Sequence, residues 1–118
     1  QIDNMLVNQY QFNGMHRVGY AYWRNDLLEE SSYYFDLQMD YCNRGIEFDL
    51  PYAQQYLAHY DRAGIYAFRE EREKAFEDLR RFNQKTKIPR WWYVLIKQDP
   101  LFDNIREEPE FQSLFLAG

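Results

Sequence analysis

The segment YDRAGIYAFREEREKAFEDLRRF, residues 60–82, decides the fold of this chain. Its small and apolar residues recur at steps of three and four, which is the period of an amphipathic helix. The segment predicts two helices joined by a tight turn around residues 69–71. Because this turn contains no glycine or proline, we expect helical conformation to continue almost unbroken across it. The residues predicted to close the pair on itself are Ala63, Tyr66, Ala75, Leu79 and Phe82.

The rest of the chain also predicts helices, with short connections between them. Asp3 and Asp26 have the residue type and position expected of N-caps. Gly14 is expected to weaken the first helix, and Gly45 to end the second one as a left-handed C-cap. The helices are expected at residues 3–25, 26–43, 51–68, 72–83 and 90–97, with short helical turns at 101–105 and 108–114.

Residues 19–35 repeat the spacing of residues 63–79, in which a small residue, a tyrosine, a second small residue and a large residue follow one another. Small residues are needed where two helices of a hairpin cross, because they let the backbones approach. The equivalent pairs are Gly19 and Ala63, Tyr22 and Tyr66, Ser31 and Ala75, and Phe35 and Leu79.

These spacings resemble the tetratricopeptide repeat family, whose unit is an antiparallel helix pair of about 34 residues. The second copy is the closer match, since the first has Ser31 and Gln38 where the family has small residues. The resemblance implies an all-α fold in which antiparallel hairpins, at about 12–43 and 51–84, stack as a short right-handed superhelix. A third helix and a capping tail would occupy residues 89–118.

The segment WWYVLIKQDPLFDNIREEPEFQSL, residues 91–114, resembles the end of the repeat array in many bacterial multi-domain signalling proteins. A solenoid needs its last apolar face covered. Arg106 is expected to pair with Asp99 or Asp103 and so to fix the tail. The residues expected to cover the apolar face are Leu101, Phe102, Ile105, Phe111 and Leu114.

The formal net charge of −5 argues against nucleic acid or an anionic membrane as the main partner. No apolar run approaches membrane-spanning length, so we expect no direct membrane insertion. The single cysteine, Cys42, cannot form an internal disulfide. This fits a reducing compartment and favours the cytoplasm, with the periplasm left open. The chain begins at Gln1, and we interpret it as one domain, residues 1–118, cut from a longer polypeptide.

The residues that could support catalysis or metal binding are few. The two histidines, His16 and His59, and the one cysteine are too few for a structural zinc site. A nucleophilic Cys42 would need a base beside it, and the sequence places none. We therefore expect no catalytic residue, no metal and no cofactor. His59 is expected to be packed or hydrogen-bonded at the edge of the core, and Cys42 to be a small buried apolar residue.

In tetratricopeptide arrays the first helix of each pair lines a concave groove, and the resemblance implies the same here. Aromatic rings would supply contact area, and Arg24 would bind a carboxylate. The residues expected to bind a partner are Asn13, His16, Tyr20, Trp23, Arg24, Tyr60 and Phe68.

The sequence thus predicts a non-catalytic module for protein–protein interaction, from the C-terminal repeat region of a larger bacterial protein with a signalling or regulatory role. Two alternatives stay open. The chain could serve only as a structural cap or as a homodimerisation module. It could also be a small-ligand sensor or an accessory domain of an enzyme, with the ligand among Tyr20, Trp23, His59 and Tyr60.

Overall fold

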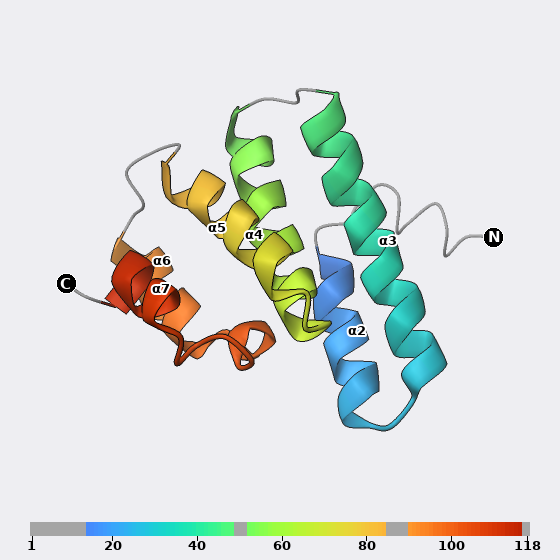
Figure 1. The fold of residues 1–118 in the computed structure, drawn as a ribbon. Coiled ribbons are helices and arrows are strands. Elements are labelled where there is room, and N and C mark those ends of the chain that lie inside the picture. Colours follow the sequence, from blue (N-terminus) through green and yellow to red (C-terminus); the bar gives the residue numbers. More distant parts are fainter. Residues whose placement is uncertain (1–13, 49–51, 85–89, 117–118) are drawn as a thin grey trace.

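A computed structural model describes residues 14–48, 52–84 and 90–116, and every element in these ranges is helical (Figure 1). This confirms the expected all-α class. The longer helices are α2 (Met15–Arg24), α3 (Leu28–Glu47), α4 (Tyr52–Phe68), α5 (Arg72–Gln84) and α6 (Arg90–Gln98). The C-terminal tail adds η3 (Pro100–Phe102), α7 (Pro109–Phe111) and η4 (Gln112–Leu116), the last with π-helical geometry.

The helices are arranged as two hairpins and a C-terminal segment. Helix α2 packs on α3, α4 packs on α5, and α3 also packs on α4. Figure 1 shows α2 and α3 on one side of the molecule, α4 and α5 in the middle, and α6 and α7 on the other side. The second hairpin therefore has neighbours on both sides.

The larger apolar core lies between the second hairpin and the C-terminal segment. Its members include Ala63, Ala75, Leu79 and Phe82, four of the five residues expected to close the hairpin. A smaller cluster of Phe35, Ile65 and Leu101 joins the two hairpins to the tail. The tail residues buried against these clusters are Leu101, Phe102, Ile105 and Phe111, and Leu114 packs against them partly buried, as expected.

The two hairpins turn in the same way. Asp26 in the first turn and Glu70 in the second both have a φ of 63°, in the left-handed region. The backbone N–H of the next residue donates to a tyrosine carbonyl in each turn, Leu27 to Tyr22 at 3.0 Å and Glu71 to Tyr66 at 2.8 Å. The expectation of nearly unbroken helix across residues 69–71 is therefore wrong, because one left-handed residue reverses the chain without any glycine.

The ends of the helices differ from the expected ones at several positions. Asp26 does not cap α3, whose N-cap is Leu27 and has no side-chain cap. Gly45 does not end a helix but is buried inside α3, since packing of this face outweighs the low helix propensity of glycine. Helix α2, the first described helix, begins at Met15, and Gly14 is its N-cap. The expected cap at Asp3 lies outside the described residues.

Candidate functional site

A groove of about 660 Å³ lies where α2, the C-terminal end of α4 and the tail meet. We call it the Trp23 groove. Its lining combines aromatic residues with charged and polar ones. The lining residues are Tyr20, Trp23, Arg24, Asp26, Phe68, Glu70, Pro100, Asp103 and Asn104.

Three rings that contact one another form the aromatic wall of the groove: Tyr20, Trp23 and Phe68. Trp23 meets Phe68 edge-on, with ring centroids 5.0 Å apart and planes at 88°. Tyr20 lies 5.6 Å from Trp23 and 6.0 Å from Phe68. Phe68 also stacks on Phe35 of α3 at 4.8 Å, which connects the wall to the buried cluster. Trp23 nevertheless keeps 43% of its surface exposed.

Charged side chains border the aromatic wall. Arg24 ends α2, where a cation is favoured by the helix dipole. Asp26 and Glu70 are the left-handed residues of the two turns. Among the ion pairs found between described residues, none involves Asp26 or Glu70. Asp103 differs, because its carboxylate accepts a hydrogen bond from Arg106 at 2.6 Å. The expected pairing of Arg106 with Asp103 is thus confirmed.

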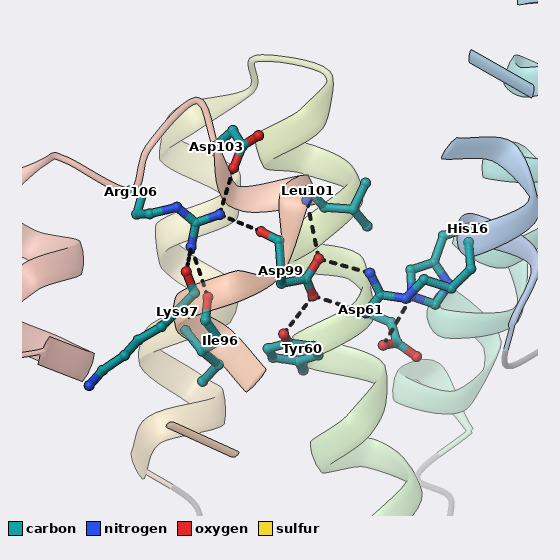
Figure 2. Close-up of polar contacts among 10 residues, drawn as sticks. His16, Tyr60, Asp61, Ile96, Lys97, Asp99, Leu101, Asp103 and Arg106 are labelled. Atoms are coloured by element: carbon teal, nitrogen blue, oxygen red, sulfur yellow. Dashed lines mark hydrogen bonds and ion pairs between the residues drawn. The ribbon is translucent and has the colours of Figure 1, made fainter. Parts of the chain in front are cut away.

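The tail wall of the groove is fixed by side chains that bond to backbone carbonyls. The amide of Asn104 donates to the carbonyl of Ala67 at 3.0 Å, near the end of α4. The guanidinium of Arg106 donates to the carbonyls of Ile96 at 3.0 Å and Asp99 at 2.6 Å (Figure 2). These bonds hold the groove side of the tail against both α4 and α6.

The carboxylate of Asp99 ties this wall to both hairpins (Figure 2). Arg17 of α2 donates to both of its oxygens, at 2.8 and 2.9 Å. The hydroxyl of Tyr60 on α4 donates at 2.6 Å, and the backbone N–H of Leu101 donates at 3.1 Å. We call these four residues the Asp99 clasp.

The clasp changes the titration of its members. Burial by itself would raise the pKa of Asp99, but the hydrogen bonds and charge of Arg17, with the Tyr60 bond, outweigh it and lower that pKa. Burial and the neighbouring Asp99 carboxylate raise the pKa of the Tyr60 phenol. Asp99 is therefore ionised and Tyr60 is neutral at physiological pH, which keeps the Tyr60 hydroxyl a donor.

Of the seven residues expected to bind a partner, the structure brings four together: Tyr20, Trp23, Arg24 and Phe68 all line the groove. His16 and Tyr60 do not, since each is only 2% exposed. Tyr60 belongs to the Asp99 clasp. His16 faces α4, with its Nε2 atom 3.5 Å from Asp61 Oδ1. Both were expected in the groove because they share its helices, but burial removes them from contact with a partner. Asn13 lies outside the described residues.

Sequence reasoning missed the polar side of the groove: Asp26, Glu70, Asp103 and Asn104. Two of these residues carried a usable signal. Asp26 and Glu70 are separated by the same 44 positions as Gly19 and Ala63, so the repeat places them equivalently. The two tail residues carried none, because their place depends on how the tail docks.

Three other titratable residues, His59, Asp78 and Cys42, are buried and lie outside the groove lining. His59 Nδ1 lies 2.8 Å from Asp78 Oδ1, and Arg62 donates to both oxygens of Asp78 at 2.7 Å. This group links α4 to α5 and confirms His59 as a hydrogen-bonded residue of the core. Cys42 is fully buried, as expected, and burial raises the pKa of its thiol. A thiol in that state is a poor nucleophile.

The described ranges contain neither a membrane-spanning helix nor a metal-binding cluster. No helix there combines the length and apolar character needed to cross a membrane. Nor do three or more His, Cys, Asp or Glu side chains gather there in a way that could hold a metal ion. Comparisons with protein-family models, curated proteins and solved structures gave no match for this chain.

Proposed function

We propose that this chain is a non-catalytic protein–protein interaction module that binds a peptide segment of its partner in the Trp23 groove. The observation that carries the proposal is the exposed aromatic wall, whose Trp23 ring is held by contacts with Tyr20 and Phe68. Pre-positioned aromatic side chains of this kind dominate the energy of many protein interfaces.

The way the groove is built also supports this use. Its walls come from two helices and from a tail that side-chain hydrogen bonds fix in place. A rigid site loses little conformational entropy on binding, so more of the contact energy appears as affinity. The small-ligand alternative has less support, because two of the residues expected to hold a ligand, His59 and Tyr60, are buried away from the groove.

We further infer that the two hairpins are copies of one unit, stacked as in tetratricopeptide arrays, with the tail as a cap. Besides the matching turns, the faces of α2 and α4 support this. On α4, Arg62 donates to Asn43 of α3 at 2.9 Å and Arg69 to Asp36 of α3 at 2.8 Å. The equivalent face of α2, 44 residues earlier, borders a shallow and mainly apolar depression lined by Val18, Ala21, Tyr22 and Leu27, with Arg17 and Asn25. Such a face suits a preceding hairpin.

The tail resembles the end of the repeat array in many bacterial multi-domain signalling proteins. We therefore propose that the module serves a larger bacterial protein with a signalling or regulatory role in the cytoplasm.

A peptide selection tests the binding proposal. The 118-residue chain is immobilised, a random peptide library is selected against it, and affinities of the enriched peptides are measured by calorimetry. Trp23→Ala should weaken their binding by tenfold or more, because it removes the most exposed ring of the wall. Tyr33→Ala is the matched control: Tyr33 is 54% exposed on α3 and does not line the groove. Circular dichroism should show equal helicity for all three proteins.

Equal binding of the selected peptides to the wild type and Trp23→Ala would remove the groove as the binding site. Absence of any enriched peptide, together with self-association that Trp23→Ala abolishes, would instead favour the homodimerisation alternative.

A further inference from the structure

We propose that the Trp23 groove recognises a cationic side chain, lysine or arginine, presented by a basic peptide segment of the partner. The inference rests on the proposed function, since it names the partner chemistry of the same site. It follows from three properties of the groove: its charges, the exposed surface of its Trp23 side chain and the balance of charge in the surrounding chain.

The charges bordering the groove are mainly negative. Its lining includes three carboxylates and one guanidinium. Asp103 already has a cationic partner in Arg106. Asp26 and Glu70 are exposed, and the ion pairs of the described residues include neither of them. Two carboxylates that have no ion-pair partner in the described part of the chain attract a cation and disfavour a peptide carboxylate near them.

The aromatic wall adds a second reason for a cation. The face of an aromatic ring carries partial negative charge, and tryptophan binds cations best among the aromatic side chains. Trp23 has 43% of its surface exposed beside Asp26 and Glu70 in the groove lining. A lysine or arginine side chain can lay its methylene groups on the rings and direct its charged end to the carboxylates. An uncharged apolar side chain would use only the rings.

Arg24 fits the same partner in another way. It lies in the last turn of α2, and it lines the groove together with Asp26. Its guanidinium can donate to a backbone carbonyl or an acidic side chain next to the cation of the peptide. The groove lining therefore offers groups for both a cation and an acceptor of a bound peptide.

The net negative charge of the chain favours its association with a basic peptide segment. Up to residue 59 the sequence has three basic and eight acidic residues, and the whole chain has a net charge of −5. A negative field around the groove raises the association rate of a basic segment, and salt should reduce that rate.

The test uses the peptides selected on the full chain. Each lysine is replaced by norleucine and each arginine by citrulline, so that the charge is lost and most of the shape is kept. The enriched peptides should share a lysine or arginine, and the neutral analogues should bind roughly tenfold more weakly. The double variant Asp26→Asn, Glu70→Gln should weaken the charged peptides to a similar extent. It should also reduce the dependence of affinity on salt.

Glu29→Gln, Glu30→Gln is the matched control, because both carboxylates are exposed in the first turn of α3 and do not line the groove. It should leave affinity and salt dependence close to the wild type. The inference is overturned if peptides bind in a Trp23-dependent way but contain no shared cation, or if their neutral analogues bind equally well; the proposed function then stands. If no peptide depends on Trp23, the proposed function fails first.

Discussion

The two hairpins have the same turn but differ in the seam, which is the place where the two helices of a hairpin cross. In the first, the helices cross at Gly19 and Ser31, and the Ser31 hydroxyl donates to the Gly19 carbonyl at 2.7 Å. In the second, they cross at Ala63 and Ala75, which are fully buried. A helix hairpin with this turn therefore accepts either a polar or an apolar crossing, provided that the residues stay small.

The difference has a cause in the neighbouring large residue. A Cβ atom on Gly19 would lie 3.0 Å from a ring carbon of Phe35 and 3.0 Å from the carbonyl oxygen of Ser31. Phe35 occupies the place that Leu79 has in the second hairpin, and its larger ring leaves no room for a methyl group. The first seam is therefore closed by a ring and a hydrogen bond, whereas the second is closed by methyl groups.

The largest effect is expected where the tail joins both hairpins. Asp99→Ala should lower the free energy of unfolding at neutral pH by about 3 kcal/mol. It leaves the buried Tyr60 hydroxyl and the Leu101 N–H without their acceptor and frees Arg17. Urea titration followed by circular dichroism measures this change. Asp103→Ala is the control, since its ion pair with Arg106 is exposed, and it should cost less than about 1 kcal/mol.

The same variant has an expected pH dependence. The pKa of Asp99 is lowered in the folded state. Its stabilising effect is therefore fully present above the unfolded pKa of about 4 and is lost as the pH falls through the lower folded value. The difference between wild type and Asp99→Ala should shrink in acid below that range. A constant difference down to pH 2 would contradict the ionic role of Asp99.

An intermediate effect is expected at the two seams. Gly19→Ala should destabilise the protein by about 2 kcal/mol, because the added methyl group meets Phe35 and the backbone of Ser31. Ala63→Gly, at the equivalent position, should also cost about 2 kcal/mol, because it loses helix propensity and the burial of one methyl group. Thermal unfolding of both variants checks that each seam depends on its own small residue. If Gly19→Ala proved neutral, the first seam would have room for a methyl group and the two seams would be interchangeable.

The smallest effect should come from the turns, and it should be stabilising. Glu70→Gly should raise the free energy of unfolding by about 1 kcal/mol, since glycine adopts a φ of 63° without strain. Asp26→Gly should gain less, about 0.5 kcal/mol, because aspartate tolerates the left-handed region better than glutamate. Chemical denaturation of the pair measures both gains. A loss of stability in Glu70→Gly would show that the side chain has a structural role.

Much of the fold could be predicted from the sequence, because helical periodicity and turn residues are local signals. The stripes of Ala63, Ala75 and Leu79, and the start of the last helix at Pro109, are examples. The left-handed turns could not be predicted. Glycine is the usual residue in that conformation, and it stands neither at Asp26 and Glu70 nor directly after them. Their conformation follows from the packing of the helices on either side.

The groove was predictable only on its α2 and α4 side. Tyr60 and Trp23 both lie on first helices of hairpins, and sequence spacing cannot say which of them the tail covers. Tyr60 is covered because its hydroxyl meets Asp99, 39 residues away in the chain. Contacts between residues so far apart in the chain depend on how the tail docks, and no local sequence pattern predicts them.

The span of the Asp99 clasp has a consequence for the order of folding. Arg17 and Asp99 are 82 residues apart, whereas the Ser31–Gly19 bond within a hairpin spans 12. Local contacts close with little loss of chain entropy and form early, so the hairpins should fold before the tail docks. The tail wall of the Trp23 groove should thus be completed last and released first during partial unfolding. A bound peptide that touches this wall should slow its release, and hydrogen exchange in residues 99–106 should be the earliest to respond.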